Sequence, residues 1–206
     1  MTHSRTRGER RRHQTIQEIL DHAVAVMDEV GVAGLSMSEV ARRVGMRPPS
    51  LYKYVPSRLA LFDLLFRDGQ QANLEAFRAG AEGAPAGLNA LAKALQASGR
   101  WALANQSLAK LLFSRPVPGF EPSAEAFAPS LEMVADVQQM LRDAVARGEL
   151  RPEAAGPDGL TIVSILTTGV LSQQLSNEPD AAFDDGRYTR LAPRLFDMFT
   201  KYYEVT

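Results

Sequence analysis

The sequence predicts an all-α fold, with a three-helix N-terminal domain followed by a larger helical C-terminal domain. Apolar residues recur at three- and four-residue steps through most of the 206 residues, as on one face of an amphipathic helix. No segment of useful length shows the two-residue alternation of a strand. Glycine and proline clusters separate the periodic segments, which gives each helix a defined beginning and end.

The composition is that of an ordinary globular chain, with 45% hydrophobic and 23% charged residues. The absence of cysteine excludes disulfides, thiolate metal sites and cysteine nucleophiles. The most apolar stretch, residues 160–171, is shorter than the roughly 18 residues of a membrane span. The N-terminus also lacks the apolar core of a signal peptide. We therefore expect a cytoplasmic protein with no membrane partner.

Charge is distributed unevenly along the chain. Residues 1–67 hold 11 Lys and Arg against 7 Asp and Glu, whereas residues 68–206 hold 12 against 17. A basic front and an acidic back indicate that only the front meets a polyanion.

Residues 1–13 carry five arginines without apolar periodicity, which favours a flexible basic arm or a merely solubilising tail. Thr15 and Glu18 then form the pattern of a capping box, so the first helix is expected to begin at Thr15 and to end before Gly31. The apolar face of this helix is expected to lie in the core.

A helix-turn-helix follows. Ser36 and Glu39 repeat the capping-box pattern before a short helix over residues 37–44, and Gly45 ends that helix. Pro48 and Pro49 are expected to begin the next helix. N–H groups in the first helical turn have no acceptor within the helix, so proline loses no hydrogen bond there. Two short helices joined by a turn with glycine are typical of this motif.

The third helix is expected to turn Leu51 inward and a small, aromatic and cationic surface outward. Such a surface suits a DNA major groove, because hydroxyl and phenol groups reach phosphates and lysine reaches phosphate or guanine. The outward residues are Pro48, Pro49, Ser50, Tyr52, Lys53 and Tyr54. Ser57 is expected to cap a fourth helix, with Arg58 in its first turn.

The rest of the chain reads as helices. They are expected at residues 88–104, 106–113, 124–147, 158–177 and 187–203, with 114–122 as the longest irregular connection. The predicted division is an arm at 1–13, a helix-turn-helix DNA-binding domain at 14–67 and a second helical domain at 68–206, to which the resemblance described next assigns ligand binding and dimerisation.

The end of the third helix resembles the DNA-binding domain of the TetR family of bacterial transcriptional regulators. That family has a glycine turn, a helix ending in Leu-Tyr-x-(Tyr/His)-(Phe/Val), and a Ser/Asn-(Lys/Arg) start to the next helix. The matching residues here are Gly45, Leu51, Tyr52, Lys53, Tyr54, Val55, Ser57 and Arg58.

The resemblance implies contacts to DNA. Tyr52, Tyr54 and Arg58 would touch phosphates, and Ser36 and Ser38 would face the neighbouring backbone. The base or near-base contacts would come from Arg47, Pro48, Pro49, Ser50 and Lys53. Arg47 stands where many members have a Ser or Thr cap. The implied function is a repressor that binds a palindromic operator on double-stranded DNA as a homodimer and is released by a small apolar effector.

The same resemblance places a ligand pocket and a dimer interface in the second domain. The candidate pocket residues are Trp101, Asn105, Gln106, Phe113, Phe127, Met133, Gln138, Met140 and Leu166. Aromatic and methionine residues at helical spacing are also ordinary core residues, so any one of them has that alternative. The candidate interface residues are Thr167, Thr168, Gly169, Ser172, Leu191, Leu195, Phe196 and Phe199.

Catalysis is not expected. The three histidines all precede residue 23, and no paired Glu-x-x-His motif, nucleophile elbow or phosphate-binding loop occurs, so we expect no metal and no cofactor. The alternative function is a helical protein-interaction module without sequence-specific DNA binding, since tyrosine is also enriched at protein interfaces. A steep loss of binding with salt would favour DNA.

Overall fold

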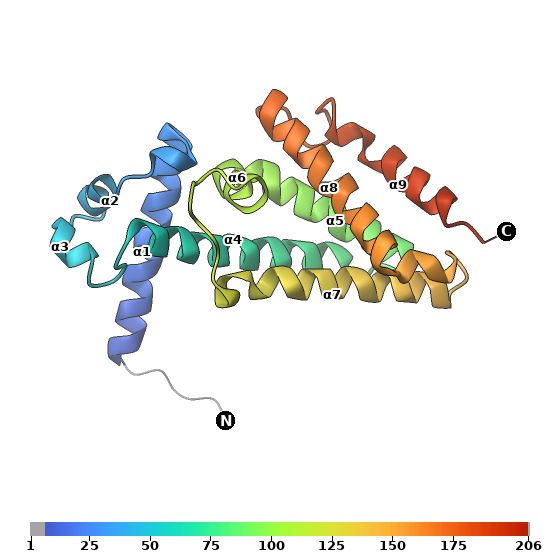
Figure 1. The fold of residues 1–206 in the computed structure, drawn as a ribbon, viewed down its shortest axis with the longest axis horizontal. Coiled ribbons are helices and arrows are strands. Elements are labelled where there is room, and N and C mark those ends of the chain that lie inside the picture. The colour runs from blue at the N-terminus through green and yellow to red at the C-terminus, as the bar shows by residue number, and fades with distance from the viewer. Residues whose placement is uncertain (1–6, 206) are drawn as a thin grey trace.

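The structure, a computed structural model, describes residues 7–205, and this part of the chain contains nine α-helices, three 3₁₀ turns and no strand. The predicted all-α fold is confirmed. A small head contains α1 (Arg7–Val30), α2 (Met37–Arg43), α3 (Pro48–Leu51) and the first turns of α4 (Arg58–Ala81), and lies at the left of Figure 1. Residues 1–6 of the expected arm lie outside the described residues.

The remaining helices form an elongated body next to the head (Figure 1). They are α5 (Leu88–Ala104), α6 (Gln106–Ser114), α7 (Ala124–Ala146), α8 (Pro157–Asn177) and α9 (Ala192–Tyr202). The 3₁₀ turns are η1 (Val32–Gly34), η2 (Pro152–Ala155) and η3 (Thr189–Leu191). The expected bounds agree with α5 to α8 to within one residue at each end. The last helix begins at Ala192 rather than at residue 187, because a turn and η3 precede it.

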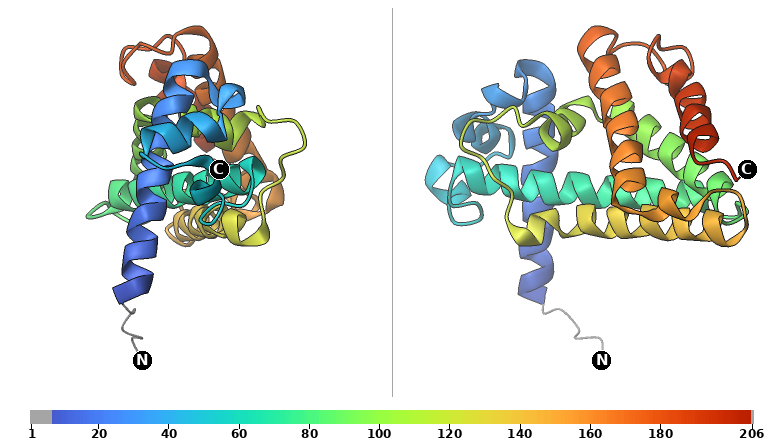
Figure 2. Two further views of the ribbon diagram at one scale, coloured as in Figure 1. Left: turned by 90° about the vertical axis from the view of Figure 1, so that its left-hand side faces the viewer. Right: turned by 45° about the vertical axis from the view of Figure 1, so that its right-hand side comes forward.

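The expected start of the first helix at Thr15 is wrong. Helix α1 already begins at Arg7, and the Thr15 hydroxyl donates to the carbonyl of Arg11 at 3.1 Å instead of capping the helix. Arginine, glutamate and glutamine have high helix propensity, so they extend a helix that the following apolar turns have nucleated. The N-terminal turns of α1 consequently project away from the rest of the molecule (Figure 2, left).

The core of the head continues into the body. Leu51, Val55 and Phe62 are fully buried and belong to the same cluster as Leu108 and Leu111 of α6. Helix α4 also runs without interruption from the head to the far end of the body, so the two parts share one helix and one apolar cluster.

Helices α4 and α7 lie side by side and run in the same direction (Figure 1). Two ion pairs set their register. Arg67 Nη1 lies 2.7 Å from Glu125 Oε1, and Arg78 Nε lies 2.7 Å from Asp136 Oδ2. In both pairs the residues are 58 positions apart, as parallel helices of equal rise require.

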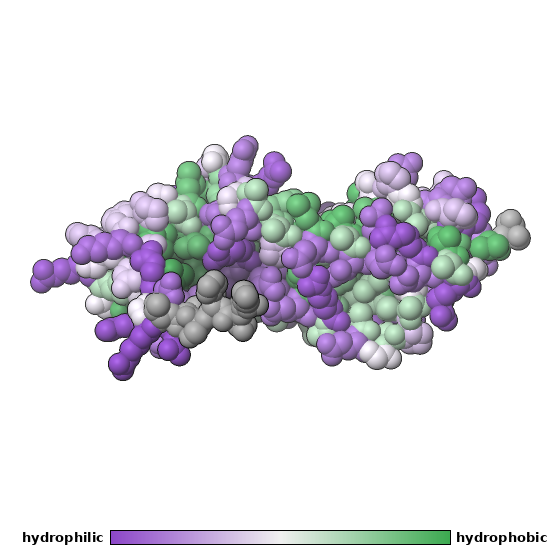
Figure 3. Space-filling model, turned by 90° about the horizontal axis from the view of Figure 1, so that it is seen from below, coloured by the Kyte–Doolittle hydropathy of each residue, from purple (hydrophilic) through white to green (hydrophobic). Residues whose placement is uncertain are grey.

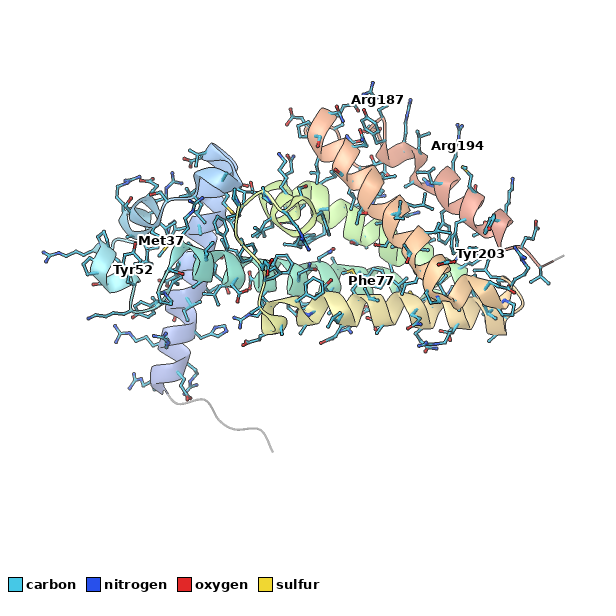
Figure 4. The ribbon with its side chains drawn as sticks, viewed as in Figure 1. Met37, Tyr52, Phe77, Arg187, Arg194 and Tyr203 are labelled. Carbon is cyan, nitrogen blue, oxygen red and sulfur yellow. The ribbon has the colours of Figure 1, made fainter. Side chains whose placement is uncertain are left out.

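Helices α8 and α9 lie on the side of α5 that faces away from α4. Near their middle, α8 and α9 are separated from each other (Figure 2, right). The body core beneath them includes Phe77 of α4, which points into the interior, and Tyr203 at the end of α9 (Figure 4). This arrangement positions the two candidate sites at different ends of the molecule.

Candidate DNA-binding surface and ligand cavity

Helix α3 presents a polar and cationic tip at the end of the head. Gly45 has a φ of 72°, a left-handed conformation that glycine adopts without steric cost, and it turns the chain from α2 into α3. Leu51 and Val55 are fully buried, whereas Pro48, Pro49 and Lys53 are exposed. Tyr52 is 48% exposed and points away from the head (Figure 4).

The start of α3 leaves Arg47 free of a capping role. Arg47 is the N-cap residue in an extended conformation, and its side chain makes no cap hydrogen bond. The prolines at the first two helical positions need no partner for an N–H group. The exposed Arg47 side chain is therefore available to a ligand, beside the half-buried Ser50.

Tyr54 differs from Tyr52, although both were expected on one outer surface. Tyr54 is half-buried and packs against the head core. The Arg12 guanidinium lies 5.3 Å from the centre of its ring, and Arg12 Nη1 lies 3.5 Å from the carbonyl oxygen of Lys53. Arg12 thus links the basic turns of α1 to the end of α3, a contact across 41 positions that no local pattern indicates.

The capping box expected at the start of α2 does not form. Ser36 is the N-cap, but its hydroxyl lies 2.8 Å from the hydroxyl of Ser38 and makes no cap bond. The Glu39 carboxylate faces Arg42 and Arg43 instead of the Ser36 backbone. Ser38 is exposed and Ser36 is half-buried, and their contact with the DNA backbone stays a prediction.

Glu39 is the centre of an ion-pair network that joins α2 to α1. Arg43 binds Glu39 at 2.7 Å and Glu29 at 2.6 Å, and Arg42 binds Glu39 at 2.7 Å. Hydrogen bonds from Arg42 and then Arg43 lower the pKa of Glu39 from 4.5 to about 2. The carboxylates thus already engage these two arginines within the head.

The expected Ser57 cap of α4 is confirmed, because its hydroxyl accepts from the Ala60 N–H at 3.0 Å. Arg58 Nη2 donates to the carbonyl of Ala33 at 2.5 Å, and its guanidinium lies 5.3 Å from the centre of the Phe62 ring. The structure thus gives Arg58 a partner inside the head, while its role toward phosphate stays a prediction.

A cavity of about 230 Å³ lies between α5, α8 and α9, outside most of the expected pocket. Of the nine candidate pocket residues only Leu166 lines it. Three candidates for the dimer interface, Thr167, Leu195 and Phe196, line it as well. The full lining consists of Ala92, Leu95, Gln96, Gly99, Val163, Leu166, Thr167, Val170, Leu171, Phe183, Ala192, Pro193, Leu195, Phe196 and Asp197.

The polar candidates for the pocket have structural partners. Asn105 Nδ2 donates to the Trp101 carbonyl at 2.9 Å, and Gln106 Nε2 donates to the Pro179 carbonyl at 2.8 Å. Trp101 and Phe113 pack against the apolar clusters around α6. These four residues therefore support the join between α5, α6 and α8.

The candidates on α7 are also placed elsewhere. Phe127 is 40% exposed, and its ring stacks on Phe66 with 6.2 Å between centroids. Met133 and Met140 pack on the body core, and Gln138 is half-buried. Helix α7 packs along α4, and none of these four residues lines the cavity between α5, α8 and α9, so their role in a pocket stays a prediction.

The candidate residues for the dimer interface differ in their exposure. Gly169 and Ser172 are exposed on α8 and Leu191 is exposed before α9, while Thr168 is half-buried. Phe199 is a correction, because it is only 3% exposed and packs against Tyr203 of its own chain. Two exposed apolar side chains extend this face, Ile165 at 61% and Met198 at 66%.

Other site types are not found in the described part of the chain. Residues 7–205 contain no group of three His, Asp or Glu side chains that could hold a metal ion. No described helix combines the length and the hydropathy that crossing a bilayer requires. Hydrophilic side chains instead project from the end of the molecule that carries α2 and α3 (Figure 3).

Comparison with known proteins agrees with this geometry. Residues 19–65, which cover most of the head, match the family described as bacterial regulatory proteins, tetR family. The HTH-type transcriptional repressor DrrR1 of Streptomyces coeruleorubidus is 36% identical over 114 residues, which are 53% of this chain and 39% of DrrR1. The match thus spans less than two thirds of the length of this curated relative.

Two solved structures share the whole fold. The TetR family transcriptional regulator PfmR of Thermus thermophilus superposes with a TM-score of 0.67 at 18% identity, over 89% of this chain and 97% of PfmR. FadR of Bacillus subtilis, solved in complex with stearoyl-CoA, gives a TM-score of 0.70 at 14% identity over 89% of this chain and 97% of FadR. Residues 19–65, with the exposed α3 tip, therefore match the DNA-binding domain of the TetR family, and the chain has the fold of these two solved regulators.

Proposed function

We propose that this regulator is a repressor that binds a palindromic operator as a homodimer and leaves it when a small molecule binds the body. The observation that carries the proposal is the α3 tip, where Pro48, Pro49 and Lys53 are exposed above the buried Leu51. A small, apolar and cationic surface of this kind can contact thymine methyl groups, guanine and phosphates in a major groove.

Homodimerisation is supported by the outer face of α8 and α9. Ile165, Met198 and Tyr202 are large, exposed and on neighbouring helices. Contiguous exposed apolar side chains of this size mark interaction sites, and two copies related by a twofold axis would cover each other's patch. Such a dimer would present two α3 tips to successive major grooves, about 34–36 Å apart or somewhat more.

The basic turns of α1 support additional phosphate binding. Arg7, Arg10 and Arg11 are exposed on turns that project from the head, and Arg12 connects these turns to Tyr54. We therefore retain the proposed division into arm, DNA-binding domain and ligand-binding domain, with the arm helical from Arg7 onward. We also propose a cytoplasmic location, in keeping with this role in DNA binding.

Selection from a random duplex library at physiological salt tests the proposal. A palindrome with fixed half-site spacing, together with a dimer mass in solution, is the expected result. Enrichment of no sequence by folded protein would contradict operator binding, and enrichment of a single half-site by a monomer would contradict the dimer. Binding of the selected site should fall steeply with salt, whereas a protein-interaction module would show no such dependence on duplex DNA.

A further inference from the structure

We propose that the cavity between α5, α8 and α9 binds a small apolar molecule that carries a positively charged amine, with the Asp197 carboxylate as its counter-ion. The inference deepens the ligand response proposed above and rests on it. Binding to the cavity can nevertheless be measured without DNA, so the two proposals can fail separately.

The C-terminal end of α9 is firmly attached to the body. The Arg151 N–H donates to the Tyr203 carbonyl at 2.8 Å, and Arg151 Nη2 donates to the Tyr202 carbonyl at 2.5 Å. The Tyr203 ring is buried beneath this end of the helix (Figure 4). The last turn of α9 is therefore fixed both by hydrogen bonds and by packing.

The connection that leads into the N-terminal end of α9 is held by the buried side chain of Gln174. Its Oε1 accepts from the N–H groups of Tyr188 and Thr189 at 3.2 and 3.3 Å, and its Nε2 donates to the Glu178 carbonyl at 2.6 Å. A buried amide with its partners satisfied orders the chain around it. Because α9 is held at both ends, the cavity under its first half is a feature of the fold.

One wall of the cavity is set by Phe183 from the connection between α8 and α9. Its ring packs against Gly99 so closely that a Cβ at this position would collide with it. The Arg100 guanidinium lies 4.9 Å from the ring centre and forms two hydrogen bonds with Asp184, at 2.6 and 2.8 Å. These contacts hold the ring at the edge of the cavity.

The charge of the lining favours a cation. Asp197 is the one ionisable residue among the lining residues, and none of them is Lys, Arg or His. The Asp197 carboxylate makes no ion pair or hydrogen bond with another side chain in residues 7–205. An anionic ligand would lie next to this carboxylate without a compensating positive charge, whereas an ammonium group would form a charge-assisted hydrogen bond with it.

The remaining lining fits the apolar part of such a molecule. Leu95, Leu166 and Val170 offer aliphatic contacts, and the Phe183 and Phe196 rings can also interact with a nearby cation. A volume of about 230 Å³ is below the roughly 300–1,000 Å³ typical of pockets for drug-sized ligands. The cavity thus suits one ring with a short amine chain, and it cannot enclose a molecule as large as the stearoyl-CoA bound to FadR.

Isothermal titration calorimetry on the full chain tests the inference with three matched probes: 2-phenylethylamine, 2-phenylethanol and 3-phenylpropionate. Asp197 is exposed, so water keeps part of the ammonium charge solvated. We therefore expect the amine to bind about tenfold more tightly than the alcohol, and the carboxylate more weakly than both. Asp197→Asn should remove the preference for the amine and leave binding of the alcohol unchanged. The matched control, Asp185→Asn, changes an exposed carboxylate outside the cavity and should keep the preference.

Two variants test the position of the site. Leu166→Trp and Val170→Trp each fill the cavity and should abolish binding of all three probes, with circular dichroism used to confirm the helical fold. Equal binding of the amine and the alcohol by the wild type, or amine binding that survives in a folded cavity-filled variant, overturns the inference. Affinity for the selected operator, measured on the same preparation, tests the proposed function separately.

Discussion

The Asp63 carboxylate accepts hydrogen bonds from both the backbone N–H and the hydroxyl of Ser123, at 2.7 and 2.8 Å. Asp63 lies in the second turn of α4, and Ser123 is the N-cap of α7, where its hydroxyl also accepts from the Ala126 N–H. One carboxylate therefore fixes the end of the connection 115–123 against the helix that leaves the head.

Asp63→Ala should lower the free energy of unfolding by about 1–2 kcal/mol, because it removes two hydrogen bonds to a charged acceptor at a partly exposed site. Asp63→Asn keeps one acceptor oxygen and should lose less. Urea denaturation followed by circular dichroism measures both changes. The control is Glu121→Ala in the same connection, which should be near neutral, and equal losses in Asp63→Ala and Glu121→Ala would contradict the role of the Ser123 contact.

Acid should destabilise the head through Glu39. Its pKa is about 2 in the folded chain against an ordinary value of 4.5, so its stabilising contribution is complete above pH 4.5 and is lost as the pH falls toward 2. The urea midpoint of the wild type should therefore decrease more steeply between about pH 5 and 3 than that of Glu39→Gln, which does not titrate. Glu18→Gln, on the exposed side of α1, should keep the wild-type slope, and identical slopes for all three proteins would exclude this contribution.

The two tyrosines of the α3 region should separate DNA binding from stability. Tyr52→Ala combined with Lys53→Ala removes exposed side chains, so operator affinity should fall about tenfold or more per side chain while Tm stays unchanged. Tyr54→Ala should also lower Tm, because Tyr54 packs on the head core and under Arg12. Fluorescence polarisation on the selected operator and thermal denaturation measure the two effects. Full operator affinity in the double variant would contradict the assignment of α3.

Gln174 should be a stability determinant of the α8–α9 connection. Gln174→Met has a similar volume but leaves the N–H groups of Tyr188 and Thr189 without their acceptor, which should cost about 1–3 kcal/mol. Hydrogen exchange at residues 178–191 should accelerate in parallel. The exposed neighbour Gln173 provides the control as Gln173→Met, and a loss of the same size there would assign the effect to helix α8 as a whole.

The head could be predicted largely from the sequence because its signals are local. Gly45, the paired Pro48 and Pro49, and Ser57 each act within one turn of the backbone, and the structure places a turn or a helix start at each. Local signals misled at Thr15 and Ser36, where a capping pattern is present but the hydroxyls bind other oxygens. A capping sequence shows which hydrogen bonds a hydroxyl could form, and the residues packed around it determine which of them forms.

The cavity could not be predicted because its walls come from distant segments. Phe183 meets Gly99 from the middle of the connection that follows α8, and only the placement of α9 next to α5 and α8 brings Asp197 to the same cavity. Aromatic and methionine residues on α7 have the spacing of cavity walls, but Met133 and Met140 pack against the body core instead. Helical periodicity indicates which face is apolar and leaves open what that face contacts.

Helix α9 is anchored at two places. The Gln174 amide holds the connection before the helix, and Arg151 holds the last turn of the helix. Neither Gln174 nor Arg151 lines the cavity between α5, α8 and α9. Substitutions such as Leu166→Met or Val170→Ile can therefore change the shape of the cavity without removing the hydrogen bonds that anchor α9. The shape and chemistry of the cavity can therefore change by exchange of a few lining side chains while the helical architecture stays the same.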